Sequence, residues 1–238
     1  MATPARSTTP TTPSNPTTYA RVYVWELPVR FYHWMNALCV AVLIVTGFLI
    51  GSPRALSTSA EAYQSYSFGI VRFLHFVAAF TFFFNFMFRI YWGFVGNQYA
   101  RWTNFIPHVR EQIKEMKEVL QVDVLQTRLK GAISIGHNAL AGFVYFLSFL
   151  AFLFQSLTGF ALYSSMSKSF FPRLFAWITP LMGGDFGVRQ WHHAFMWFFI
   201  LFTIVHVYLV FYHDYIEARG TVSSMVGGWK FERIRRTK

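Results

Sequence analysis

The chain has 238 residues, of which 54% are hydrophobic, 21% are aromatic and only 13% are charged. Soluble domains usually carry about 25% charged residues, so this composition excludes an ordinary soluble protein and indicates a chain solvated largely by lipid. The net charge of +11 does not favour a nucleic-acid partner, because the basic residues flank apolar runs and do not form one basic face.

Four uncharged stretches divide the chain and predict an all-α membrane protein, a bundle of four transmembrane helices. A helix needs about 20 predominantly apolar residues to span the hydrocarbon core. Helices are expected near residues 32–52, 69–92, 132–162 and 189–213.

The flanking segments complete the predicted organisation around a membrane domain of residues 21–215. Residues 1–20 are rich in Thr, Pro and Ser and lack the apolar stretch of a signal peptide, which predicts a disordered N-terminal tail. Residues 93–130 form a polar loop, and residues 216–238 form a basic tail.

The distribution of Lys and Arg predicts the orientation of the bundle. Of the 21 Lys and Arg residues, only five fall on the side of the membrane opposite the N-terminus. These are Arg54, Arg72, Lys168, Arg173 and Arg189. Because basic residues accumulate on the cytoplasmic side, both termini and the loop of residues 93–130 are expected there.

Four histidines lie inside the predicted helices, where an ionisable side chain is costly and usually functional. His192 and His206 are 14 residues apart, so they return to nearly the same helix face at depths about 21 Å apart. His33 lies near the cytoplasmic start of its helix, and His75 lies near the outer start of the next one. Depth therefore pairs His75 with His192, and His33 with His206. Two opposed axial imidazoles satisfy a haem iron, so the pattern predicts two bis-histidine haems stacked across the membrane.

Two positions lie fourteen residues after a predicted ligand, on the same helix face. Gly47 follows His33 and reaches the depth of the outer haem, where a glycine lets a porphyrin edge approach the backbone. The alternative for Gly47 is ordinary helix packing through small residues. Arg89 follows His75 and reaches the depth of the inner haem, where it would meet a propionate or a quinone. The alternative for Arg89 is a positive flank on the cytoplasmic side.

Three further polar residues are candidates with open alternatives. His193 adjoins His192 and is a rival ligand, but it lies about 140° away from the helix face of His206, so His192 is preferred. His137 and Asn138 open the 132–162 helix at the depth of the inner haem. They are either hydrogen-bond donors to quinone carbonyls or a polar helix start.

Cys39 is the only cysteine, so the chain by itself builds no disulfide and no thiolate-ligated iron–sulfur cluster. The absence of a C-x-x-C-H sequence excludes a covalently attached c-type haem. The sequence also holds one internal echo. Residues 46–48 and residues 158–160 are both Thr-Gly-Phe and lie at corresponding ends of the 32–52 and 132–162 helices.

Two runs of residues resemble the signatures of the cytochrome b subunit of membrane-bound NiFe hydrogenases. The first is RFYHWM at residues 30–35, followed by Thr-Gly at residues 46–47. The second is RQWHH at residues 189–193, which continues to His206. Together they contain His33, His192 and His206.

The resemblance covers nearly everything after residue 20. GHNALAG at residues 136–142 is similar to the start of the family's third helix. Gln190 and Ala194 depart from the usual second signature, and neither is a predicted ligand, so the haem assignment is little affected.

The resemblance implies a dihaem cytochrome of the bacterial cytoplasmic membrane that anchors the large and small hydrogenase subunits on the periplasmic side. It implies that iron–sulfur clusters of the small subunit deliver electrons to a haem b held by His75 and His192. A second haem b, held by His33 and His206, would then reduce membrane quinone. The chain would be the electron-transfer and quinone-reducing subunit of a hydrogen:quinone oxidoreductase, with no hydrogen-splitting site of its own. The implied quinone-site candidates are His137, Asn138 and Arg89.

Three alternatives stay open. Membrane cytochrome b subunits of formate dehydrogenases share the four-helix dihaem design, and so do free-standing cytochrome b561-type proteins that act on quinone or superoxide. A different class is a non-haem transporter or anchor, in which the histidines relay protons or pack. The two signatures favour the hydrogenase partner, and the depth-matched pairs argue against a protein without haem.

Overall fold

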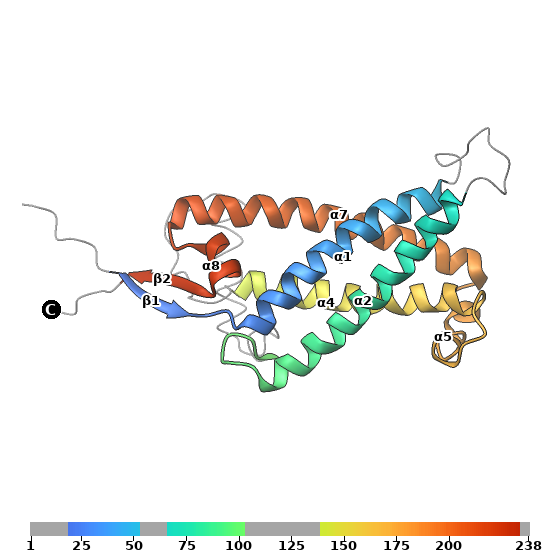
Figure 1. The fold of residues 1–238 in the computed structure, drawn as a ribbon, viewed down its shortest axis with the longest axis horizontal. Coiled ribbons are helices and arrows are strands. Elements are labelled where there is room, and N and C mark those ends of the chain that lie inside the picture. The colour runs from blue at the N-terminus through green and yellow to red at the C-terminus, as the bar shows by residue number, and fades with distance from the viewer. Residues whose placement is uncertain (1–18, 53–65, 103–138, 234–238) are drawn as a thin grey trace, which may run out of the picture.

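The computed structural model describes residues 19–52, 66–102 and 139–233. Within them, four helices are long and apolar enough to cross a membrane, as the sequence predicts (Figure 1). They are α1 (Leu27–Gly51), α2 (Ser67–Val95), α4 (Ala139–Ser164) and α7 (Gly184–Glu217). His137, Asn138 and most of the predicted 93–130 loop lie outside the described residues.

Helices α1, α2 and α7 extend beyond the uncharged stretches that predict them. α1 has Pro28 in its first turn, where a missing backbone N–H costs nothing. α7 begins directly after Gly183, whose φ of 81° favours glycine. An uncharged stretch marks the hydrocarbon span, whereas a helix continues into the interface, where charged residues such as Arg30 and Asp214 are tolerated.

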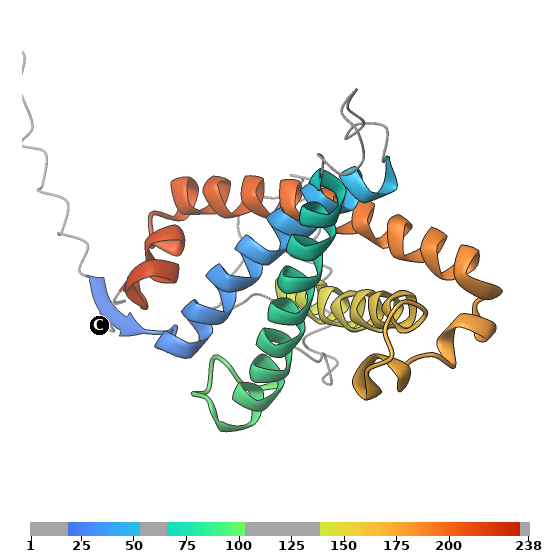
Figure 2. The same cartoon turned by 45° about the vertical axis from the view of Figure 1, so that its right-hand side comes forward.

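The four membrane helices form two closely packed pairs. α1 packs mainly on α2, and α4 packs mainly on α7 (Figures 1 and 2). Phenylalanine rings join the two pairs: the ring centres of Phe86 and Phe149 are 4.3 Å apart, and those of Phe82 and Phe152 are 4.9 Å apart. Lipid removes the hydrophobic driving force between helices, so close packing of this kind holds the bundle together.

A buried pair of asparagines joins α1 to α2. Asn85 Nδ2 donates to Asn36 Oδ1 at 2.9 Å and to the backbone carbonyl of Tyr32 at 3.0 Å. Asn36 Nδ2 donates in turn to the Tyr32 hydroxyl at 3.1 Å, and both asparagines are only 7% exposed. Unpaired amides are costly in an apolar medium, so this contact ties the register of α1 to that of α2.

A small sheet forms where the sequence analysis expects only tails. β1 (Tyr19–Tyr23) pairs antiparallel with β2 (Trp229–Arg233), so that Tyr19 lies opposite Arg233. The short helix α8 (Thr221–Gly227) precedes β2. The fold is therefore mostly helical, as predicted, with a two-stranded sheet that the sequence analysis does not anticipate. Five-residue strands in polar segments give too little apolar alternation to be recognised in one sequence.

We call β1, β2 and α8 the terminal clasp. It is fastened to the start of α1 by hydrogen bonds: Trp25 Nε1 donates to Ser224 Oγ at 3.1 Å, and Trp34 Nε1 donates to the Met225 carbonyl at 2.9 Å. Arg30 donates to the carbonyl of Val226. The described N-terminal and C-terminal segments therefore lie together at one end of the bundle (Figure 1).

Two short helices lie between α4 and α7 at the end of the bundle opposite the clasp. They are α5 (Phe170–Arg173) and α6 (Ile178–Leu181). Buried Ile178 packs with Ala161 of α4 and Val188 of α7, which closes this end of the α4–α7 pair.

Candidate functional site

His33 and His206 face each other near the clasp end of the bundle. Their ring centres are 6.3 Å apart, and the ring planes are inclined by 53°. Both side chains are partly buried, and Nδ1 of His33 is a buried nitrogen without a hydrogen bond among the described residues. α1 and α7 belong to different helix pairs, so these two imidazoles approach each other from the two halves of the bundle.

His75 and His192 lie toward the opposite end, again one from each helix pair. His75 lies on α2, and His192 lies on α7. Gly47 of α1 lies between these helices: a Cβ at Gly47 would be 3.8 Å from His75 Cε1 and 3.3 Å from the sulfur of Met196, one turn after His192. The four predicted histidines are thus arranged as two sets at two depths.

Each histidine of this second set is held by a threonine of its own helix pair. Thr46 Oγ1 lies 2.8 Å from Nδ1 of His75, and Thr158 Oγ1 lies 2.9 Å from Nδ1 of His192. Nε2 of His192 lies 3.2 Å from the side-chain nitrogen of Gln155. Both threonines are buried, at 5% and 1% exposed.

The glycines beside these threonines leave room for the imidazoles. A Cβ at Gly159 would be 3.2 Å from Cε1 of His192, which is closer than ordinary van der Waals contact. Gly47 and Gly159 are the second residues of the two Thr-Gly-Phe segments. The internal echo of the sequence therefore marks two equivalent places, each against one histidine.

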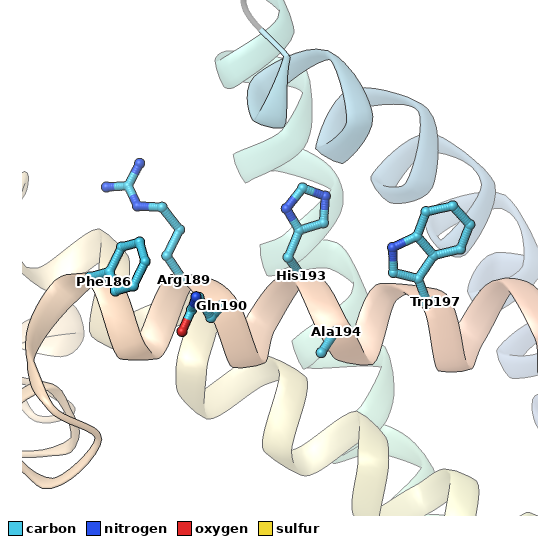
Figure 3. Close-up of a pocket in the computed structure, with 6 residues that line it drawn as sticks. All are labelled: Phe186, Arg189, Gln190, His193, Ala194 and Trp197. Carbon is cyan, nitrogen blue, oxygen red and sulfur yellow. The ribbon is translucent and has the colours of Figure 1, made fainter.

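His193 has a different environment from its neighbour His192. Its imidazole packs against Gly51 at the end of α1. It also lines an open hollow of about 460 Å³ with Arg189 and Trp197, and Figure 3 shows these side chains on the face of α7 that points toward α1. The Trp197 ring meets Phe48 of α1 edge to face, with ring centres 5.3 Å apart.

Arg89 is buried near the clasp end of α2. Its Nη2 donates to the carbonyl of Ala100 at 3.0 Å, and the guanidinium lies 5.6 Å from the ring centre of Trp102 and 6.0 Å from that of Tyr32. Tyr32 directly precedes His33 on α1, so Arg89 lies at about the depth of the His33–His206 set. Its predicted contact with a quinone or a propionate stays a prediction.

The His33–His206 set fits a metal that takes two opposed imidazoles. A metal–nitrogen bond of about 2 Å, with the ring centre about 1 Å beyond the nitrogen, separates two opposed ring centres by about 6 Å. The 6.3 Å between His33 and His206 matches this separation. The orphaned Nδ1 of His33 is also as expected where a bound group completes the site.

A four-helix membrane bundle whose two halves present histidines to each other at two depths is the arrangement expected of a membrane cytochrome. The profile of the prokaryotic cytochrome b561 family matches residues 24–228, and the chain belongs to this family. The resemblance read from the two histidine-containing signatures is thereby confirmed.

The chain is also similar to curated relatives over most of its length. It is 41% identical to a probable Ni/Fe-hydrogenase B-type cytochrome subunit of Cupriavidus necator over 216 residues, covering 87% of this chain and 86% of the relative. A protein of the same name in Azotobacter vinelandii is 41% identical over 214 residues, covering 88% of each. The probable Ni/Fe-hydrogenase 1 B-type cytochrome subunit of Escherichia coli K12 is 35% identical over 219 residues, covering 89% of this chain and 92% of the relative.

Sequence reasoning missed the roles of three residues at the site. The Thr-Gly-Phe echo drew attention to Thr46 and Thr158, but their contacts with the histidines depend on which helices pair. Gln155 has no sequence signal, because a single Gln in an apolar helix resembles any polar residue that packs in a bundle.

Proposed function

We propose that this chain is the dihaem b-type cytochrome subunit of an uptake NiFe hydrogenase. It would anchor the hydrogenase to the bacterial cytoplasmic membrane and convey electrons from iron–sulfur clusters of the small subunit to membrane quinone. The proposal is supported by the names of the relatives and by their similarity over nearly the whole chain. The observation that carries it is the presence of two histidine sets at two depths, each with one member from each helix pair.

The four histidines are the proposed axial ligands of two b-type haems. His75 and His192 would hold the haem at the end away from the clasp, and His33 and His206 would hold the haem at the clasp end. A haem bound at each set supplies a reversible one-electron carrier. The protein's part is to keep the imidazoles opposed and to surround them with phenylalanine rings that exclude water.

The direction of electron flow follows from the proposed orientation. The clasp end carries the described N-terminal and C-terminal segments and is assigned to the cytoplasm, because only five of the 21 Lys and Arg residues are predicted on the other side. Electrons from a periplasmic partner would then enter beside His75 and His192 and leave beside His33 and His206. Quinone is assigned to the cytoplasmic end, with His137, Asn138 and Arg89 as candidate contacts.

An optical difference spectrum of native membranes tests the proposal. Membranes that contain the chain and its native neighbours are reduced first with hydrogen and then with dithionite. Hydrogen alone should produce the bands of a low-spin b-type haem. Reduction by dithionite alone would assign the chain to another partner, such as a formate dehydrogenase, or to a free-standing b561-type role. No haem signal with either reductant would contradict the proposal and favour a non-haem anchor or transporter.

Two ligand variants locate the electron path. His75→Ala or His192→Ala should abolish hydrogen-driven quinone reduction, while hydrogen-driven reduction of an artificial dye by the partner subunits is retained. We call His75 and His192 the outer set, and His33 and His206 the inner set. Quinone reduction that survives both substitutions would exclude the proposed electron path through the outer set.

A further inference from the structure

The two Thr-Gly steps of the bundle are built in the same way. Thr46 on α1 contacts a histidine of its helix partner α2, and Thr158 on α4 contacts a histidine of its helix partner α7. The oxygen–nitrogen distances, 2.8 Å and 2.9 Å, are those of good hydrogen bonds. In both cases the histidine atom is Nδ1, which leaves Nε2 as the nitrogen for ligation.

The hydrogen bonds of the threonines decide which atom carries the shared proton. A hydroxyl has a single hydrogen. Thr46 Oγ1 lies 2.6 Å from the carbonyl of Val42, and Thr158 Oγ1 lies 2.9 Å from the carbonyl of Phe154. A carbonyl can only accept, so each hydroxyl hydrogen is donated to the backbone. The contact with the imidazole therefore requires Nδ1–H to donate and the threonine oxygen to accept.

This assignment leaves the lone pair of each imidazole on Nε2. In a neutral imidazole one nitrogen donates and the other accepts. The surroundings of His192 agree, because the Gln155 amide nitrogen, a donor, lies 3.2 Å from Nε2 of His192. A metal bound at Nε2 would take this lone pair in place of the Gln155 amide. The same amide nitrogen lies 3.2 Å from the carbonyl of His192, so reversing the amide would direct an oxygen at two acceptors.

The His33–His206 set lacks this support in the part of the chain that the structure describes. Nδ1 of His33 is buried and has no hydrogen-bond partner there. The nearest ring contacts of His206 are aromatic: Phe202 stacks on it with ring centres 5.5 Å apart, and Tyr145 meets it at 6.1 Å. The two sets therefore differ at Nδ1: His75 and His192 each have a threonine oxygen beside this nitrogen, and His33 has no hydrogen-bond partner there among the described residues.

We infer that Thr46 and Thr158 are positioning residues that lock both histidines of the outer set in the Nε2-ligating tautomer and lower the reduction potential of the group bound there. The inference rests on the proposed function and deepens it. A hydrogen bond from Nδ1–H increases the basicity of the imidazole toward the metal. A more basic ligand stabilises the oxidised iron, and hydrogen bonding around the ligands is one of the levers that set haem potential. A lower potential at the outer set than at the inner set favours electron movement toward the quinone end.

Substitution of each threonine by valine tests the inference. Thr46→Val and Thr158→Val keep the shape of the side chain and remove the acceptor oxygen. The purified holoprotein is titrated spectroelectrochemically, and the two haems are resolved by potential. Each variant should raise the potential of the same haem, by a several-fold change in its oxidised-to-reduced equilibrium, where tenfold corresponds to about 59 mV for one electron. The other haem should keep its wild-type potential.

Matched variants separate the hydrogen bond from general disturbance of the helices. Thr46→Ser and Thr158→Ser retain the acceptor and should restore the wild-type potential. Thr81→Val is the control, because Thr81 donates to its own helix carbonyl at 2.8 Å and faces the outside of the bundle. If a valine variant loses one haem, retention of that haem in the serine variant supports the inference, and its loss in both contradicts it.

The outcomes distinguish this inference from the proposed function. Valine variants with two haems at wild-type potentials, or with a lowered outer potential, would overturn the role of the threonines and leave the dihaem proposal intact. A shift of different haems by Thr46→Val and Thr158→Val would also overturn it, because both threonines would then not serve one site. A wild-type protein without haem would remove the proposed function itself.

Discussion

Adjacent histidines in this protein have different environments because neighbouring positions on a helix point about 100° apart. His192 faces Thr158 and Gly159 of α4, whereas His193 faces the end of α1 at Gly51. Sequence periodicity favours His192 as the ligand because its spacing to His206 returns it to the same face. The structure adds a second reason, because the His193 ring packs against Gly51 of α1.

This difference predicts separate outcomes for two neighbouring substitutions. His192→Ala should lower the haem content of the purified protein from two to one, because it removes an axial ligand of the outer set. His193→Ala should retain both haems, because His193 packs against α1. A pyridine haemochrome assay gives the haem-to-protein ratio of each variant. Loss of haem in His193→Ala alone would identify His193, and not His192, as the axial ligand.

Gly159 is predicted to be intolerant of a larger side chain. A Cβ there already comes within 3.2 Å of the His192 ring, so Gly159→Leu should displace the imidazole and reduce haem occupancy of the outer set. Gly69 on α2 is the control, because a Cβ at that position meets nothing within 4 Å. Gly69→Leu should keep full haem content. Equal haem content in the two variants would show that the close approach at Gly159 does not matter.

The residues that could be predicted from the sequence are those whose role follows from periodicity alone. Depth and helix face are sufficient to place His33 with His206, and their rings are 6.3 Å apart. Thr46 and Thr158 could not be assigned, because a threonine in a membrane helix usually bonds its own backbone. Only the pairing of α1 with α2 and of α4 with α7 shows that each also reaches a histidine.

At the scale of elements, the bundle combines apolar rings between the helix pairs with polar contacts inside each pair. Helix positions were predictable because about 20 apolar residues must cross the membrane. Which helices pack together was not, since phenylalanines cover most faces of α2 and α4 and give no clear stripe. The Asn36–Asn85 contact supplies the specificity that the apolar faces lack.

Removing this contact should measurably weaken the α1–α2 pair. Asn85→Ala leaves Asn36 Oδ1 without its donor and should lower the free energy of unfolding in detergent by about 1–2 kcal/mol. The double variant Asn36→Ala/Asn85→Ala should cost less than the sum of the single variants, because the two side chains interact directly. Thr81→Ala on the outer face should change stability by less than about 0.5 kcal/mol. Strict additivity of the two asparagine variants would contradict the proposed coupling.

At the scale of the whole molecule, the described terminal segments share one end of the bundle, and basic residues predict that this end is cytoplasmic. Cys39 is 4% exposed and is the only cysteine, so introduced cysteines can be labelled against a low background. Ser223 of the clasp and Lys168 at the opposite end are both exposed. They therefore form a matched pair for labelling.

A membrane-impermeant maleimide should discriminate these two positions. In intact spheroplasts it should label Lys168→Cys, while Ser223→Cys should react only after the membrane is permeabilised. The wild-type protein should remain unlabelled in both conditions. The reverse labelling pattern would show that the protein has the opposite orientation in the membrane, with the His75–His192 set at the cytoplasmic side.

The terminal clasp also has a consequence for biosynthesis. β1 is among the earliest described segments to leave the ribosome, yet its partner β2 begins at Trp229. At about 5–20 residues per second, β1 waits on the order of tens of seconds while all four membrane helices are made and inserted. The clasp can therefore close only after the last strand has been synthesised. Until then, Trp25 and Trp34 lack their hydrogen-bond acceptors on Ser224 and Met225. An interrupted chain would keep a bare strand edge, which is a surface that quality-control proteases and chaperones can recognise.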